Sequence, residues 1–122
     1  MTHRQCYMLD VFLANSKQVL LGVAAAESKS VKNCYSSGGS MMLYSGGGVF
    51  VGGERFNSNC KLTSGDRLQV RLDLVKKEVE WSRVWPEAAS LFTAKIPKKL
   101  SDKPLFPCVE FDSKFDGSVI LL

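Results

Sequence analysis

Residues 65–81 read GDRLQVRLDLVKKEVEW, and this stretch decides the fold. From position 67 to position 74, leucine or valine alternates with arginine, glutamine or aspartate, which is typical of a strand with one buried face. Residues 75–77 then supply a tight turn, and the alternation resumes over residues 78–81. We therefore predict an antiparallel hairpin whose apolar face packs against a core.

The rest of the chain favours further short strands. Clusters of glycine and serine at residues 36–40, 45–48 and 52–53 divide the first half into segments too short for helices of normal length. No segment shows a sustained helical period. The other predicted strands cover residues 5–13, 19–25, 41–44, 49–51, 90–95, 105–111 and 118–122. So many short strands predict an all-β fold, an antiparallel β-sandwich of two sheets.

Length and composition indicate one domain, residues 1–122. Of the 122 residues, 45% are hydrophobic and 23% charged, which suits a domain whose core needs no metal or disulfide. The longest apolar run, residues 19–26, is too short to span a membrane, and Asp10 and Lys17 interrupt any hydrophobic signal stretch. We therefore expect a cytoplasmic protein that binds no membrane.

The cysteines form no metal or redox motif. They are scattered and include no CxxC pair, so we expect no bound metal and no cofactor. Without a secretion signal, reduced thiols that pack as small buried hydrophobic groups are the simpler interpretation. The four residues are Cys6, Cys34, Cys60 and Cys108.

The hairpin resembles the core of SPRY domains. Residues 65–74 and 77–81 are similar to that family's Gly-Asp turn, its strand ending in Leu-Asp-Leu, and its return strand. Residues 104–109, PLFPCV, resemble its entry into a late strand, and residues 6–11 and 21–24 resemble two earlier strands. The resemblance covers nearly the whole chain in the right order. It implies a bent sandwich of two antiparallel sheets, a concanavalin-like jelly roll, with no leading PRY segment.

The resemblance also implies a function. SPRY domains are non-catalytic modules that bind a peptide or loop of a partner protein through loops at one end of the sandwich. They are often the substrate-recognition part of a larger ubiquitin-ligase or signalling protein. Tyr35 falls where peptide-binding members carry a pocket tyrosine, although a packing role is an equally good interpretation. The candidate partner-binding residues, all in predicted loops, are Asn33, Tyr35, Arg55, Asn57, Arg83, Trp85, Lys114 and Phe115.

Catalytic motifs are nearly absent from the sequence. The only histidine, His3, lies near the N-terminus, where it is a poor base for a nucleophilic site. Glu78 and Glu80 have the spacing of an acid and base pair on one strand face, as in some sandwich-fold glycosidases. We expect instead that Arg67 and Arg71 of the opposing strand pair with them. The sequence therefore predicts no enzyme.

Two other binding functions remain as alternatives. Nucleic-acid binding is disfavoured because the net charge of +4 is spread over the chain and four aromatic residues, Trp81, Phe92, Phe106 and Phe111, are predicted to fill the core. A carbohydrate-binding, lectin-like sandwich is the main rival, since an exposed tryptophan can stack on a sugar ring. Its candidate residues are Asn57, Asn59, Arg83 and Trp85.

Overall fold

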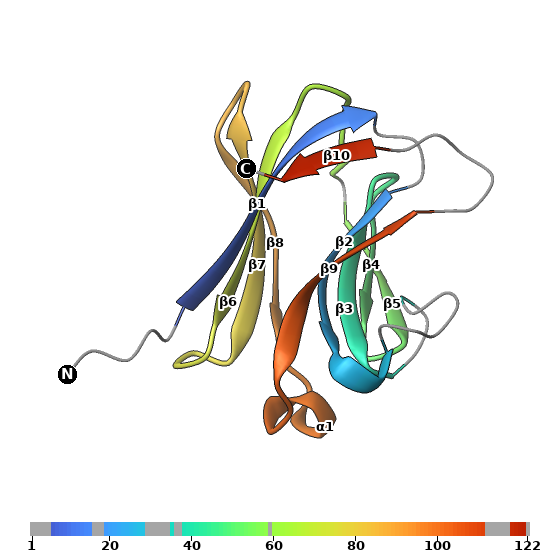
Figure 1. The fold of residues 1–122 in the computed structure, drawn as a ribbon, viewed down its shortest axis with the longest axis vertical. Helices are drawn as coiled ribbons and strands as arrows, with labels where there is room; N and C mark the ends of the chain where they lie inside the picture. Colours follow the sequence, from blue (N-terminus) through green and yellow to red (C-terminus); the bar gives the residue numbers. More distant parts are fainter. Residues whose placement is uncertain are drawn as a thin grey trace.

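The fold is a β-sandwich of two five-stranded antiparallel sheets (Figure 1). The computed structural model describes residues 6–15, 19–28, 35, 38–58, 60–111 and 118–121. The all-β prediction and the two-sheet architecture are confirmed.

The first sheet, sheet A, contains the predicted hairpin. Its strand order is β10-β1-β6-β7-β8. The hairpin strands are paired in register from Asp73 opposite Glu78 to Leu68 opposite Arg83, and Lys77 takes a positive φ of 54° in the turn. The strands are β1 (Cys6–Asn15), β6 (Arg67–Asp73), β7 (Glu78–Trp85), β8 (Ala89–Lys95) and β10 (Ser118–Leu121).

The second sheet, sheet B, contains one strand that the sequence did not predict. Its order is β5-β4-β3-β2-β9. The unpredicted strand follows a two-residue turn at Gly52 and Gly53, whose φ angles of 58° and 92° are those that a tight hairpin turn requires. The strands are β2 (Val19–Ala25), β3 (Ser40–Tyr44), β4 (Gly48–Val51), β5 (Glu54–Asn57) and β9 (Leu105–Phe111).

Two short helical turns complete the described structure. One is the 3-10 turn η1 (Ala26–Ser28), and the other is α1 (Lys98–Ser101), which links β8 to β9 at the lower end of the sandwich (Figure 1). Leu100 of α1 is buried in the core, and Lys99 Nζ donates a hydrogen bond of 2.7 Å to the Gly52 carbonyl oxygen. The α1 turn is thereby attached to the β4–β5 hairpin. No helix in the described ranges is long and apolar enough to cross a membrane.

The core between the sheets is built from alternate residues of the strands. Trp81 is buried, as predicted, and Phe92 packs against the core cluster. The prediction was wrong for two other aromatic residues. Phe106 is 52% exposed because it faces away from the core on the edge strand β9, and Phe111, at the end of the same strand, is 42% exposed. The fully buried core side chains include Val11, Leu13, Val19, Leu21, Met41, Leu43, Val49, Val79 and Trp81.

The cysteines are less buried than predicted. Cys6, Cys60 and Cys108 have intermediate exposure, and Cys60 Sγ lies 3.3 Å from the Leu91 carbonyl oxygen. Cys6 and Cys108 lie on outward faces of their strands, opposite Asp73 and Gly22. Cys34 lies outside the described residues.

Candidate functional site

The outer face of sheet B carries a stack of two rings and a guanidinium. Val49 of β4 points into the core, so the next residue, Phe50, points outward. The Phe50 ring lies edge to face with Tyr35, with centroids 4.8 Å apart, and the Arg55 guanidinium carbon lies 5.9 Å from the centroid of the same ring. Arg55 is the cross-strand partner of Phe50, so the β4–β5 hairpin places both on one face.

Tyr35 also forms a hydrogen bond with the strand at the other edge of sheet B. Its backbone N–H donates a hydrogen bond of 3.1 Å to Glu110 Oε1 on β9, whereas its ring contacts β4. Leu20 and Met42, on the two strands between β9 and β4, also point outward. Leu20 lies opposite Glu110 and Met42 lies opposite Phe50, yet both are buried. This part of the outer face is therefore a packed layer, at whose edge Arg55 lies.

Asn57 extends the polar edge of this layer. It lies two residues after Arg55 on the edge strand β5, on the same face, and both residues are exposed. Within the described part of the chain, Arg55 forms no ion pair with a carboxylate. Tyr35, Arg55 and Asn57 are thus brought to one face. The prediction that Arg55 and Asn57 lie in a loop was wrong, because both lie on strand β5. We call Tyr35, Phe50, Arg55 and Asn57 the stack site.

Arg83 and Trp85 lie on the other sheet and not in a loop. The strand β7 continues through both residues, which corrects the prediction that they lie in a loop. Arg83 lies opposite the buried Leu68, is 22% exposed, and places its Nε 3.4 Å from Asp66 Oδ2. Trp85 is 58% exposed and lies opposite Arg67. Arg83 therefore supports the residue 63–66 turn, in which Asp66 Oδ2 also accepts a hydrogen bond from the Thr63 N–H.

This placement separates the residues of the lectin-like alternative. Asn57 faces outward from sheet B, whereas Trp85 belongs to sheet A and Arg83 points toward Asp66. Four predicted residues, Asn33, Asn59, Lys114 and Phe115, lie outside the described residues.

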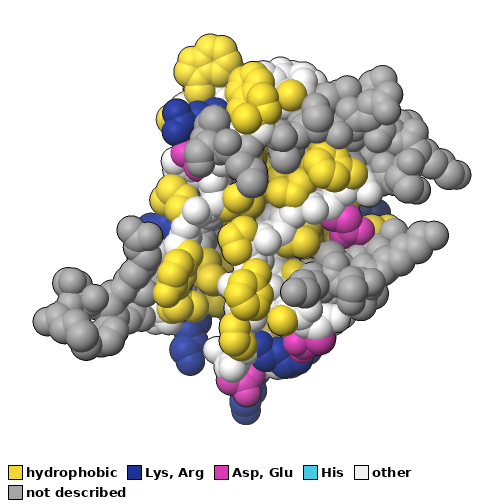
Figure 2. Space-filling model, viewed as in Figure 1, with side chains coloured by type: hydrophobic (Ala, Val, Ile, Leu, Met, Phe, Trp, Pro, Cys, Tyr) yellow, Lys and Arg dark blue, Asp and Glu magenta, His cyan; other side chains and the backbone are white. Residues whose placement is uncertain are grey.

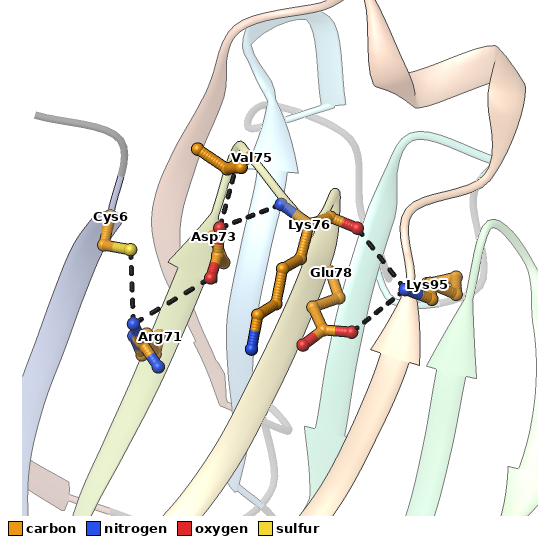
Figure 3. A network of polar contacts seen from close by, with 7 residues as sticks. All are labelled: Cys6, Arg71, Asp73, Val75, Lys76, Glu78 and Lys95. Atoms are coloured by element: carbon orange, nitrogen blue, oxygen red, sulfur yellow. Dashed lines mark hydrogen bonds and ion pairs between the residues drawn. The ribbon is translucent and has the colours of Figure 1, made fainter. Parts of the chain in front are cut away.

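A polar network covers the outer face of sheet A near the β6–β7 turn (Figure 3). Arg71 contacts Cys6 Sγ at 3.4 Å and Asp73 Oδ2 at 3.8 Å. The backbone N–H groups of Lys76 and Val75 donate to Asp73 Oδ1, and these bonds, chiefly that from Lys76, hold the pKa of Asp73 below its ordinary value. Asp73 thus stabilises the turn.

The two strand glutamates belong to this surface. Glu78 pairs with Lys95 at 3.2 Å, and Glu80 Oε2 accepts a hydrogen bond of 3.1 Å from Ser90 Oγ. The expected partners were wrong, because Arg67 pairs with Asp10 across the β1–β6 ladder and Arg71 pairs with Asp73. A shallow pocket lies here, lined by Arg71, Asp73, Lys76, Glu78 and Glu80. Charges of both signs line it, and Arg71 and Glu78 are already engaged by Asp73 and Lys95.

Sequence reasoning missed Phe50, which belongs to the stack site, and Glu110, which lies beside it. Phe50 connects Tyr35 to Arg55, and Glu110 accepts the Tyr35 N–H. The alternation of Val49, Phe50 and Val51 carries a signal for an outward Phe50, but nothing local connects Glu110 with Tyr35, which is 75 residues away. No group of three or more metal-ligating side chains occurs among the residues that the structure describes.

The arrangement of sheets and strands is that of SPRY domains. The structure of the TRIM65 PSpry domain superposes with a TM-score of 0.76 at 20% identity and covers 99% of this chain and 66% of that chain. The SPRY domain of human HERC1 superposes with a TM-score of 0.68 at 15% identity, covering 98% and 73%. Stonustoxin superposes with a TM-score of 0.72 at 17% identity, covering 96% and 19%. The chain therefore has a SPRY-like fold, as its motifs predicted.

The likeness lies in the fold alone. No protein-family model and no curated protein sequence matches the chain. The chain also spans just under two thirds of the TRIM65 PSpry chain.

Proposed function

We propose that this chain is a non-catalytic protein-interaction module that binds a peptide or loop of a partner protein at the stack site. One observation carries the proposal: the exposed Arg55 guanidinium is held over the ring of Phe50, which also contacts Tyr35 edge to face. A SPRY-like fold supports it, because that fold is shared with domains such as the TRIM65 PSpry domain.

The chemistry of the stack site suits protein recognition. Arginine and aromatic residues carry much of the binding energy at protein interfaces, particularly where their geometry is set before binding. The Phe50 ring restricts Arg55, so less side-chain entropy is lost when its N–H groups bind a partner carbonyl or carboxylate. Asn57 adds an amide that can donate to and accept from an extended backbone. The site therefore offers polar recognition on a rigid apolar base.

The wider role is part of the same proposal. We infer that residues 1–122 fold as one domain and act in the cytoplasm as the substrate-recognition part of a larger ubiquitin-ligase or signalling protein. Neither a cofactor nor a metal enters this role, and recognition requires no chemistry at Glu78 or Glu80.

The test is affinity capture with matched variants of β5. The immobilised chain is exposed to a cell lysate, and captured proteins are identified by mass spectrometry. Arg55→Ala and Asn57→Ala should each lose the same proteins, whereas Glu54→Ala should keep them, because Glu54 is equally exposed but lies on the opposite face of β5. Unchanged melting temperatures would show that the variants remain folded.

Two results would contradict the proposal. Identical captures by all variants would place any binding surface elsewhere. Glycan-array binding that depends on Trp85 but not on Arg55 would favour the carbohydrate alternative.

A further inference from the structure

Strands β1 and β9 expose side chains on their core-facing sides. Tyr7 of β1 lies opposite Leu72 of β6 and shares the face of the fully buried Val11, yet Tyr7 is 47% exposed. Phe111 of β9 lies opposite the fully buried Val19 and is 42% exposed. Large apolar side chains that face a core are normally covered. The space beside these two strands therefore lacks a covering element among the described residues.

We call this strip the β1–β9 seam. Figure 2 shows hydrophobic side chains on the face of the molecule on which β1 and β9 lie in Figure 1. None of its core-facing residues is charged. They are Tyr7, Leu9, Leu105, Pro107, Val109 and Phe111.

A free strand edge borders the seam on sheet A. Strand β10 pairs with β1 only from Val11 to Asn15, and it ends with Leu121 opposite Val11. Residues 6–10 of β1 pair with β6 on one side, and no described strand pairs with them on the other. Among the described residues, these five therefore have no ladder partner on that side.

The edge of β9 is protected and the edge of β1 is not. Strand β9 contains Pro107, which has no backbone N–H and is typical of edges that resist further pairing. Residues 6–10, CYMLD, contain no proline or lysine. Their only charge, Asp10, is bound by Arg67 Nε and Nη2 at 3.0 and 2.7 Å. No proline, lysine or unpaired charge in residues 6–10 therefore opposes the pairing of a further strand with β1.

We propose that an extended segment of a partner protein adds to residues 6–10 of β1 as an antiparallel strand, in line with β10, and closes the β1–β9 seam. Its inward side chains would cover Tyr7, Leu9 and Val109, so they must be apolar. Its outward side chains would lie beside Met8 and Asp10, in water, so they are polar. The occupant is therefore an alternating apolar and polar segment, at a surface separate from the stack site.

Charge and area favour a partner segment over a second copy of the chain. Each copy carries a net charge of +4, and the seam contains no carboxylate to offset the repulsion between two copies. Pairing two five-residue edges also buries far less than the roughly 1,200 Å² of a stable interface. A single extended segment needs less area, since its main-chain hydrogen bonds contribute to binding.

The probe is a fluorescein-labelled peptide of about seven residues with valine and threonine alternating between terminal serines. Fluorescence anisotropy with the full chain should show saturable binding, and a scrambled peptide of the same composition should not bind. Two further peptides carry N-methyl groups on the valines or on the threonines. Successive N–H groups of a strand point to opposite edges, so all the valine N–H groups face one edge and all the threonine N–H groups face the other. Methylation of the set that faces β1 should abolish binding, and methylation of the other set should not.

Matched variants locate the site. Tyr7→Lys places a cation in the seam and should weaken binding by about tenfold or more. Met8→Lys is the control, since Met8 is the next residue, is 54% exposed, and faces away from the seam. Arg55→Ala should leave this peptide's affinity unchanged, so failure here and failure of the stack site give different patterns.

Three outcomes would overturn the proposal. They are no saturable binding at the highest soluble peptide concentration, equal loss in Tyr7→Lys and Met8→Lys, and equal effects of the two methylated peptides. A Tyr7-dependent dimer in sedimentation velocity would also overturn it, because a second copy would then occupy the edge.

Discussion

Trp81 Nε1 of sheet A donates a hydrogen bond of 2.9 Å to the Leu21 carbonyl oxygen of sheet B. Both residues are almost fully buried, and both belong to the core cluster. The bond crosses from β7 to β2 through the sandwich interior, where a backbone carbonyl without a partner is costly. A single side chain thus supplies both apolar volume and a directed contact between the two layers.

Replacing this indole should be markedly destabilising. We expect Trp81→Phe to lower the free energy of unfolding by about 2–4 kcal/mol, because it removes a buried hydrogen bond and part of the packed volume. Urea unfolding followed by circular dichroism measures the change. Trp85→Phe is the control: Trp85 lies on the same strand but is exposed, and we expect a change within about 0.5 kcal/mol. Equal losses in the two variants would contradict this account of Trp81.

Gly22 is required by the close approach of β2 and β3. A Cβ atom at this position would overlap the Met41 carbonyl oxygen, which belongs to the sheet and cannot rotate away. We expect Gly22→Ala to cost about 2–4 kcal/mol or to prevent folding. Gly65→Ala tests the argument, because Gly65 has a φ of 97° but no atom within 4 Å of an added Cβ. Its backbone strain alone should cost about 1 kcal/mol in urea unfolding.

Asp10 makes stability depend on acidic pH. The hydrogen bonds from Arg67 are the main reason why the pKa of Asp10 lies below its ordinary value of 3.8, with Gln69 adding a further bond. A depressed folded-state pKa means that the carboxylate stabilises the fold above the unfolded-state value. This contribution is therefore present above about pH 4 and is lost as the pH falls through the lower folded-state pKa.

The measurement is urea unfolding between about pH 7 and pH 2. We expect Asp10→Asn to lose less stability on acidification than the wild-type chain. Arg67→Met should show the same reduced dependence, because it removes the cation that lowers the pKa of Asp10. Some dependence should remain in both variants, since Asp73 also has a depressed pKa. An Asp10→Asn profile parallel to that of the wild type would disprove the role of this pair.

The sheets could be predicted because the alternation of apolar and polar residues along a strand is visible in the local sequence, whereas the missed segments lack that alternation. The prediction of β7 ended at Trp81 because Arg83, a charged residue, occupies the next position on the same face, opposite Leu68, so the last four residues of the strand lack the apolar signal. Strand β5 carries no buried residue, so its sequence, ERFN, lacks the apolar signal that identified the other strands.

The candidate site was predictable in residue type and not in position. Tyr35, Arg55 and Asn57 share one face only because the β4–β5 hairpin places Arg55 opposite Phe50, and Tyr35 reaches that ring across the sheet. Arginine is a residue type typical of binding sites, but the Arg83 side chain forms an ion pair with Asp66. Neither partnership can be inferred from neighbours along the chain.

Phe50 should control partner binding without touching the partner. If Phe50 positions Arg55 through its ring face, Phe50→Leu keeps an apolar side chain on β4 but removes the cation–π contact, worth about 0.5–1 kcal/mol at an exposed site. We expect a partner identified by capture to bind Phe50→Leu about two- to fivefold more weakly, and isothermal titration calorimetry measures the change. The Phe50→Tyr variant is the control, because it retains an aromatic face and should bind within about twofold of the wild type. If Arg55→Ala weakened binding while Phe50→Leu did not, Arg55 would act alone and the ring would be packing only.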